Sequence, residues 1–269
     1  MACLPLHHIG GFGVVARAVL TGTAVEVHDH FDVELIRAAL DRSATHISLV
    51  PAMCAFVTPM TDRLDVHDLE RFERVLLGGS TIPPKRPANC IATYGMTETG
   101  GGIVYDGWPL PGVTLRADDD GQLLVQSPTL FRRLRSGSAS PDADRWWATG
   151  DLGRVTTDGR VVVDGRADEV IITGGEKVWP APVEAVAATM DGVADVAVVG
   201  RADERWGQVV TALVVRAQLD PPVDPAELLA RIREGVKAVL PAYCAPHAIE
   251  IVSVIPRTSI GKIRRAELR

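Results

Sequence analysis

Apolar and polar positions in the first part of the chain alternate in blocks that predict strands separated by helices. Residues 45–50 predict a buried strand that stops at Pro51, and residues 75–77 predict a second strand that ends in glycines. Residues 32–40 have apolar positions at helical spacing behind an acidic first turn, which indicates an amphipathic helix. This alternation favours an α/β layer arrangement, in which ligands bind at the carboxyl ends of the strands.

Three further segments extend this α/β part. Within residues 4–20 an apolar, helix-like stretch follows Gly13, residues 25–28 predict a short strand, and residues 52–60 predict another helix. No strand is predicted ahead of the first helix to pair with the later strands of this part. We therefore expect an incomplete large α/β domain over residues 1–165.

From Gly112 the pattern changes to short alternating segments with turn residues between them. Asp120 and Gly121 precede an apolar run, and a second Asp-Gly pair separates two more runs before residue 165. Asp-Gly between alternating segments is typical of hairpins. The sequence thus predicts a small β subdomain over roughly residues 112–165 of the large domain.

Beyond a predicted hinge near residues 166–168, residues 169–269 have the length of a small domain of their own. Strands are predicted at 170–172, 196–199 and 209–215, and a helix at 182–190. Asp224, Pro225 and Glu227 form a helix start. The helix is expected to bury one face, made of Leu228, Leu229, Ile232, Val236, Val239 and Leu240. The order of elements implies an α+β module.

Composition narrows the class of protein. The 269 residues are 46% hydrophobic and 23% charged, as in ordinary globular proteins. A net charge of −6 argues against a nucleic-acid partner and against anchoring to an anionic membrane. No signal peptide or membrane-spanning run is evident, so we expect a cytoplasmic protein without a membrane anchor. The four cysteines, Cys3, Cys54, Cys90 and Cys244, are scattered and are expected to be reduced core thiols.

Candidate chemistry is concentrated in residues 93–99, where a strand-like run leads into a turn. The ring of Tyr94 could stack on a base, Thr97 could donate to a phosphate oxygen, and Glu98 could hold Mg²⁺. A polar turn after a strand is also ordinary loop chemistry. On this stretch alone the two interpretations are equally open.

A second glycine-containing turn follows the strand at 75–77. Gly78, Gly79 and Ser80 would let a flat ligand lie against bare backbone, and Gly95 offers the same close approach in the first turn. Both turns are expected at the carboxyl ends of strands, and hence at the same edge of the sheet.

Five motifs occur in a fixed order along the chain: 94–99, 149–151, 165–169, 174–177 and 256–265. Together they resemble the acyl-CoA synthetase, or adenylate-forming, superfamily over nearly the whole chain. Within that superfamily, residues 4–11 and 105–110 are most similar to the o-succinylbenzoate–CoA ligases of menaquinone synthesis.

The resemblance implies a two-step reaction. A small carboxylic acid attacks the α-phosphorus of ATP to give an acyl-adenylate and pyrophosphate, and the thiol of coenzyme A then displaces AMP. It implies that Tyr94 stacks on adenine in a nucleotide site that includes Gly78, Gly79, Ser80 and Gly95. Thr97 would contact the AMP phosphate, and Glu98 would hold Mg²⁺.

The same resemblance assigns roles nearer the hinge. Asp151 would accept from both ribose hydroxyls, and Arg166 would add a donor there. Asp168 would be the hinge residue about which the small domain rotates. Gly174 and Gly175 would line the tunnel for the pantetheine arm, although a simple strand-ending turn is the alternative.

Two remaining roles concern the reacting carboxylate. Lys262 would bridge the acyl carboxylate and the α-phosphate, where a compact ammonium offsets charge between two anions. The alternative for Lys262 is a solubilising lysine near the end of the chain. His8 would close the acyl pocket, or would have a structural role only.

The chain departs from the superfamily pattern in one respect: no Ser/Thr/Gly-rich loop for the β- and γ-phosphates occurs in its sequence. We expect a gene fragment, a start assigned too far downstream, or a separate N-terminal half as partner, and a homo-oligomer is a further possibility. The alternatives for function are another aryl or acyl acid–CoA ligase and a non-catalytic remnant that binds AMP or coenzyme A.

Overall fold

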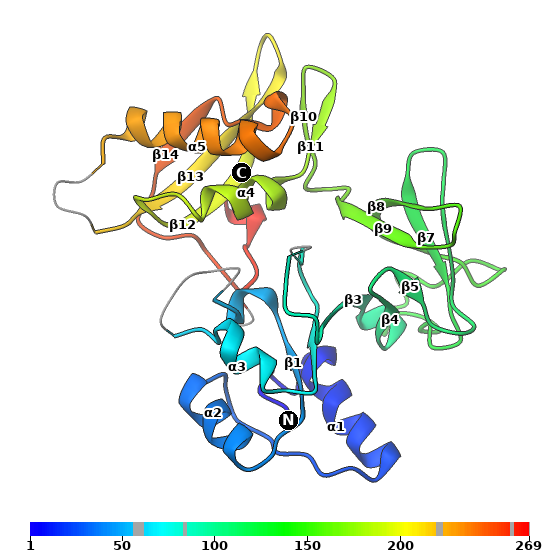
Figure 1. Ribbon diagram of the computed structural model, residues 1–269. Helices are drawn as coiled ribbons and strands as arrows, with labels where there is room; N and C mark the ends of the chain where they lie inside the picture. Colours follow the sequence, from blue (N-terminus) through cyan, green and yellow to red (C-terminus); the bar gives the residue numbers. More distant parts are fainter. Residues whose placement is uncertain (56–61, 83–84, 219–222, 259–260, 269) are drawn as a thin grey trace. The chain divides into compact units, whose positions relative to one another are not determined.

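The computed structural model in Figure 1 describes residues 1–269 except 56–61, 83–84, 219–222, 259–260 and 269. Its internal contacts divide the chain into two compact units, Met1–Asp164 and Gly165–Arg269. The first unit contains two sheets and the second unit one, and each unit has a hydrophobic core of its own.

The first unit begins with a five-stranded sheet and its helices. The strands, in their spatial order, are β1 (His46–Leu49), β2 (Arg74–Leu77), β3 (Cys90–Met96), β4 (Gly101–Tyr105) and β5 (Trp108–Pro109). The helices are α1 (Ile9–Thr21), α2 (Val33–Asp41) and α3 (Val66–Glu70), with short 3₁₀ turns η1 (Pro51–Met53) and η2 (Thr97–Thr99). Strands β1 to β3 are parallel, whereas β4 and β5 are antiparallel. The carboxyl ends of β2 and β3 therefore meet at one edge.

Local signals explain these elements. The Asp32 carboxylate accepts from the Leu35 amide and starts α2, and Asp65 starts α3 in a reciprocal capping box with Asp68. The fully buried side chains alternate along the strands, as in Ile47 and Leu49 of β1. They pack with α2 into one core.

A four-stranded antiparallel sheet completes the first unit. It consists of β6 (Thr114–Ala117), β7 (Gln122–Gln126), β8 (Trp147–Val155) and β9 (Val161–Arg166), which ends just past the boundary between the units. Leu123 and Val125 of β7 pack with Ile103 and Val104 of β4, so the two sheets share a core. This shared core fixes the second sheet against the strand that follows η2.

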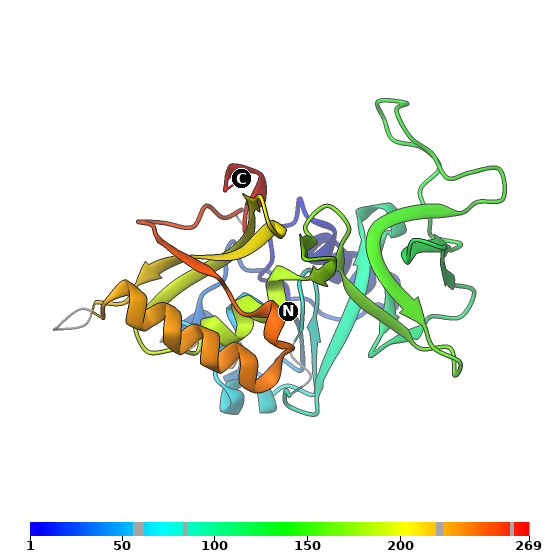
Figure 2. The same ribbon diagram turned by 90° about the horizontal axis from the view of Figure 1, so that it is seen from above.

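The second unit contains β10 (Ile171–Thr173), β11 (Glu176–Val178), α4 (Pro180–Ala187), β12 (Val193–Asp203), β13 (Gly207–Arg216), α5 (Pro225–Val239), η3 (Ala242–Cys244), β14 (Ala248–Ile251) and η4 (Arg265–Glu267). The strand order is β11-β10-β13-β12, and β14 pairs in parallel with β13. Helices α4 and α5 pack on one face. On the other face Ile255, Ile263 and Leu268 pack against β12 and β13, and Figure 2 shows this C-terminal segment and α5 on opposite sides of the long strands.

The predicted mixed α/β class is confirmed, and so are most individual elements. Asp224 starts α5 by accepting from the Ala226 and Glu227 amides. The Asp-Gly hairpins also lie where the sequence predicted them. No helix in the described ranges is long and apolar enough to cross a bilayer.

Four expectations were wrong. The predicted strand at 25–28 is only an isolated bridge between Ala2 and Val27, because no neighbouring strand extends the pairing. The predicted helix at 52–60 is replaced by η1 at its start, and residues 56–60 lie outside the described residues. Val239 is 67% exposed, since the last turn of α5 passes the edge of the core. The second unit also has a strand, β11, that the sequence did not predict.

Candidate functional site

The polar motif at the end of β3 continues into a tight turn, η2, and the buried Thr99 hydroxyl holds this turn in place. Strand β3 continues to Met96, so Tyr94 and Gly95 lie in a strand and not in the predicted turn. Pairing with β4, which places Tyr94 opposite Val104, extends the strand. The Thr99 hydroxyl accepts from the Met96 amide at 3.0 Å and lies 2.8 Å from the Gly101 carbonyl, to which it donates.

Because Thr99 points inward, the two residues before it face outward. Thr97 is exposed and Glu98 is half-buried. Within the described residues, neither side chain has a hydrogen bond or an ion pair. Their backbone carbonyls are used: that of Thr97 accepts from the Gly100 amide at 3.1 Å, and that of Glu98 from the Phe131 amide at 2.8 Å. A hydroxyl and a carboxylate are therefore presented side by side at the carboxyl end of β3.

The glycines that border this turn have a packing role. A Cβ on Gly95 would lie 2.0 Å from the Gly101 carbonyl oxygen, and one on Gly78 would lie 2.4 Å from the Thr93 hydroxyl. Only glycine fits between the backbones of β3 and β4 at Gly95. Gly79 and Ser80 are exposed after β2, at the same edge as Thr97.

One hydrogen bond joins the two sheets of the first unit at this edge. The Tyr94 hydroxyl donates to Oδ2 of Asp151 over 2.7 Å, from β3 to β8. Asp151 is buried, and its amide donates to the Thr149 hydroxyl, which in turn donates to the Leu123 carbonyl. The structure thus brings together an aromatic ring and a fixed carboxylate that are far apart in sequence.

The start of α1 lies beside the same turn. His8 is the N-cap residue of α1, and its carbonyl accepts from the Gly11 and Phe12 amides. A Cβ on Gly101 would lie 3.7 Å from Ile9. The His8 ring is half-buried and lies 4.4 Å from the ring of His7.

The other predicted site residues belong to the second unit. Arg166 and Asp168 are exposed and form an ion pair at 3.1 Å. Gly174 and Gly175 form a two-residue turn with φ of 58° and 88°, which joins β10 to β11 as an antiparallel hairpin. The simple-turn alternative is thus observed, and it leaves a ligand role open because both glycines are exposed.

An exposed aromatic side chain that the sequence analysis missed adjoins that turn. A Cβ on Gly174 would lie 2.7 Å from the ring of Trp206. Trp206 is 41% exposed and stacks at 6.4 Å on His247, with the Arg205 guanidinium 4.9 Å from its ring. The signal that could have found it is a tryptophan inside the polar turn 203–207.

Lys262 is exposed on a segment with an ordered backbone. Its amide donates to the Thr258 hydroxyl at 3.1 Å, and its carbonyl accepts from the Thr258 amide at 2.8 Å. Arg257 donates to the Gly261 carbonyl at 2.7 Å and to both carboxylate oxygens of Asp195. No carboxylate of the described residues pairs with the Lys262 ammonium.

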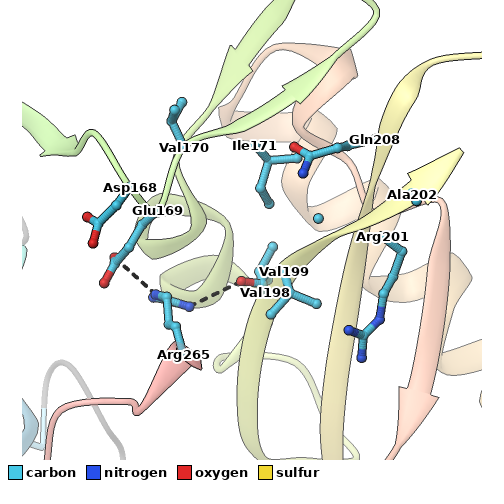
Figure 3. Close-up of a pocket in the computed structure, with 11 residues that line it drawn as sticks. Asp168, Glu169, Val170, Ile171, Val198, Val199, Arg201, Ala202, Gln208 and Arg265 are labelled. Carbon is cyan, nitrogen blue, oxygen red and sulfur yellow. Dashed lines mark hydrogen bonds and ion pairs between the residues drawn. The ribbon is translucent and has the colours of Figure 1, made fainter. Parts of the chain in front are cut away.

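A cavity of about 400 Å³ lies in the second unit, and Arg265 at the end of this segment lines it (Figure 3). Arg265 closes one side of it, with Nε 3.0 Å from Glu169 and a hydrogen bond to the Val198 carbonyl at 3.1 Å. Glu169 directly follows Asp168, which also lines the cavity. The sequence analysis did not single out Arg265.

The buried cysteines are held in the neutral thiol form, which is the less reactive one. Burial raises the pKa of Cys3 and Cys90 to about 11 and that of Cys54 to about 12. All four cysteines are buried and free, as predicted. The residues that the structure describes contain no group of three or more His, Cys, Asp or Glu side chains able to hold a metal.

Comparison with known proteins gives consistent matches along the chain. Residues 1–123 match the model of the AMP-binding enzyme family, and residues 182–262 match that of the AMP-binding enzyme C-terminal domain. A probable 2-succinylbenzoate–CoA ligase of Mycobacterium tuberculosis is 38% identical, over 100% of this chain and 73% of the relative. The indoleacetate–CoA ligase of Aromatoleum aromaticum is 31% identical, over 100% of this chain and 58% of its own length.

Solved structures of an o-succinylbenzoate CoA synthetase are also similar to this chain. The o-succinylbenzoate CoA synthetase of Bacillus subtilis in complex with its acyl-adenylate intermediate has a TM-score of 0.82 at 27% identity, over 99% of this chain and 60% of that one. The same enzyme with ATP and a magnesium ion gives 0.81 at 29% identity, again over 99% of this chain and 60% of that one. The chain therefore spans 73% of the mycobacterial relative and about 60% of the solved homologue.

Proposed function

Because this chain belongs to the AMP-binding enzyme family, we propose that it is an AMP-forming acid–CoA ligase, or the larger part of one. A carboxylate oxygen of the acid bonds to the α-phosphorus of ATP as pyrophosphate leaves. The sulfur of coenzyme A then bonds to the acyl carbon as AMP leaves. The observation that carries this proposal is the Tyr94–Asp151 pair beside Thr97 and Glu98 at one edge of the first unit.

In the first unit we assign the nucleotide. The Tyr94 ring stacks on adenine while its hydroxyl stays on Asp151, and the Asp151 carboxylate accepts from the ribose hydroxyls. The Thr97 hydroxyl donates to the AMP phosphate. The backbone of Gly78, Gly79, Ser80 and Gly95 would border the base. His8 borders the acid at the start of α1.

The side chains present fit a magnesium ion held jointly with phosphate oxygens. Mg²⁺ is commonly bound through one or two carboxylates plus the phosphates of a substrate. Glu98 supplies one carboxylate that has no other partner in the described residues. When bound, the ion would neutralise charge on the triphosphate and its leaving group.

In the second unit we assign the mobile parts of the site. The Lys262 ammonium offsets the charge of the acid carboxylate and the α-phosphate as they approach. Arg166 adds a donor at the ribose, and Asp168 serves as the hinge between the two half-reactions. Gly174 and Gly175, exposed in their turn, border the pantetheine arm.

We propose 2-succinylbenzoate as the acid, on the strength of the 38% identity to the mycobacterial relative. An aryl acid such as indoleacetate is the second candidate, since that ligase is 31% identical. The proposed location is the cytoplasm, where ATP, coenzyme A and reduced thiols coexist. The proposed partner is a polypeptide that supplies the phosphate loop. Light scattering of the purified chain, alone and with that polypeptide, tests both for this complex and for a homo-oligomer.

The experiment is an assay of both half-reactions. The purified chain is incubated with Mg-ATP, coenzyme A and one acid from a panel of 2-succinylbenzoate, indoleacetate and anthranilate. Mass spectrometry then follows AMP, acyl-adenylate and thioester. We expect thioester from 2-succinylbenzoate, either from the chain alone or after a polypeptide with the phosphate loop is added.

Two variants sharpen the assay. Lys262→Ala is expected to abolish adenylate formation and to leave thioester formation from supplied acyl-adenylate intact. Lys237→Ala, on the exposed side of α5, is the matched control and should change neither step. Absence of every product, together with retained binding of AMP, would favour a remnant that binds nucleotide without catalysis.

A further inference from the structure

The segment that carries Lys262 is fastened to the second unit on both sides of the lysine. Upstream, Arg257 bridges Asp195 and the Gly261 carbonyl. Downstream, Ile263 packs on the face of the sheet opposite α4 and α5, and Arg265 lines the cavity of Figure 3. An exposed lysine thus projects from a backbone that is held in place.

Arg265 makes the most extensive of these contacts. Two of its guanidinium nitrogens donate to the two carboxylate oxygens of Glu184 in α4, at 2.7 and 2.9 Å. Nε pairs with Glu169 at 3.0 Å, and one nitrogen also reaches the Val198 carbonyl. Its side chain is only 12% exposed and that of Glu184 13%. Burial lowers the pKa of Arg265, but the hydrogen bonds and charge of Glu184 and Glu169 more than offset this and raise it.

The partner carboxylate is itself fixed. Glu184 accepts from the Val198 amide at 2.7 Å, so α4, β12 and Arg265 meet at one carboxylate. A planar guanidinium can satisfy two carboxylates and a carbonyl at once, which a lysine ammonium cannot do in the same geometry. The contacts therefore define one orientation of Arg265.

The neighbouring arginine provides an internal comparison. Arg264 points to solvent and pairs only with Glu267, at 3.1 Å, with both side chains 53% exposed. Such an exposed pair contributes little to order. Adjacent residues of the same type thus have opposite environments, and of these two arginines it is the side chain of Arg265 that joins the Lys262 segment to the body of the unit.

We propose that Arg265 is a positioning residue for Lys262: its bonds to Glu184, Glu169 and Val198 hold the segment so that the ammonium is presented at a fixed place. This inference rests on the proposed function of Lys262. Because Glu169 follows the hinge residue Asp168, the same contacts make the hinge end and the lysine segment move as one piece. A lysine on a loose segment would have to be ordered at every turnover, at an entropic cost.

The first test measures the segment itself and needs no activity. Amide hydrogen exchange is followed by mass spectrometry in peptides that cover Lys262 and, separately, α4 and β12. In Arg265→Ala we expect exchange around Lys262 to accelerate at least about 10-fold more than exchange in α4 and β12, which lose the same buried ion pair. Arg264→Ala should leave all three unchanged. An equal effect of both variants, equal acceleration throughout the unit, or no acceleration would each overturn the proposal.

The second test separates positioning from general stability. Arg265→Ala should lower kcat for adenylate formation about 10- to 100-fold, with KM for ATP nearly unchanged and thioester formation from supplied acyl-adenylate intact. Arg265→Lys keeps the positive charge but loses the planar guanidinium with its several donors. Its kcat for adenylate formation should lie between those of the unsubstituted chain and Arg265→Ala. Equal loss of both half-reactions would point to a purely structural role and would contradict the proposal.

The two proposals fail in different ways. If the unsubstituted chain, with or without the added polypeptide, forms no adenylate, the proposed function fails, and the exchange measurement still decides whether Arg265 fixes the Lys262 segment. If Lys262→Ala abolishes adenylation and Arg265→Ala changes neither exchange nor kcat, the function stands and the positioning role falls.

Discussion

The two candidate regions of this chain are held by different forces. The Tyr94–Asp151 site lies at strand ends in the first unit, where β3 and β4 approach so closely that Gly95 admits no side chain. The described residues of the Lys262 segment, 256–258 and 261–265, lie outside the regular strands and are fastened by ion pairs of Arg257 and Arg265. Backbone pairing fixes the first region and side-chain charge fixes the second.

This difference has a physical consequence. Strand pairing is a property of many residues at once, and it changes little with salt or pH. Ion pairs depend on ionisation and, where exposed, on ionic strength.

The largest expected effect is that of a side chain between β3 and β4. Gly95→Ala should destabilise the first unit by about 3 kcal/mol or more, because the new Cβ would lie 2.0 Å from the Gly101 carbonyl oxygen. Gly175→Ala is the control: its φ is 88° but no atom lies within 4 Å, so a loss of about 1 kcal/mol is expected. Denaturant unfolding measures both, and equal losses would argue against a backbone-fixed site.

Removal of the central carboxylate of the second region should come next. Glu184→Ala leaves the Val198 amide without its acceptor and takes from the Arg265 guanidinium one of its two carboxylates, at a cost of about 2–3 kcal/mol. Glu204→Ala, at an exposed position in the same unit, should change stability by less than about 0.5 kcal/mol. Urea unfolding of the two variants tests this, and a similar result for both would mean that the ion pairs contribute nothing.

A smaller effect is expected from the side-chain hydrogen bond between Tyr94 and Asp151, which joins the sheets at the site. Tyr94→Phe removes the 2.7 Å donor to Asp151 and should cost about 1–2 kcal/mol, since the acceptor is a buried carboxylate. Tyr105→Phe removes only a 3.4 Å contact to the Gly102 carbonyl and should cost less than about 0.5 kcal/mol. Thermal unfolding of the pair of variants measures the difference, and its absence would show that the bond is not formed in solution.

The smallest effect concerns pH and the second unit. Hydrogen bonds from Arg201 hold the pKa of Glu250 below its usual value. A depressed carboxyl pKa adds stability above the unfolded value of about 4.3, and this is lost as pH falls through the folded pKa. The protection of amides near Leu268, whose carbonyl also binds Arg201, relative to their unfolded exchange rate at the same pH, should therefore fall modestly below about pH 4. Glu250→Gln should remove that pH dependence, and an unchanged profile in the variant would assign it to another group.

Much of the fold followed from local signals. Helix α5 was predicted from Asp224, Pro225 and Glu227, because an N-cap acid and a first-turn proline act within one turn of the chain. Strands β1 and β2 were predicted from short apolar runs bounded by proline or glycine. The strand at 25–28 failed because pairing partners lie elsewhere in the sequence and the pattern alone does not supply them.

The site was predicted in part. Motif order indicated Thr97, Asp151 and Lys262, but it did not show that Tyr94 lies in a strand or that its hydroxyl binds Asp151. Trp206 and Arg265 were missed altogether. Their environments are made by segments distant in sequence, such as the Gly174 turn for Trp206 and α4 for Arg265.

The sequence by itself determined the α/β class, the elements with strong local signals, and the residue types that suit nucleotide chemistry. Only the tertiary structure decided which of those residues meet, and which of two adjacent arginines is buried in a network of carboxylates. The physical reason is that propensity, capping and turn chemistry act over a few residues. Hydrogen bonds and ion pairs between remote segments depend on how the sheets pack, and that packing is a property of the whole unit.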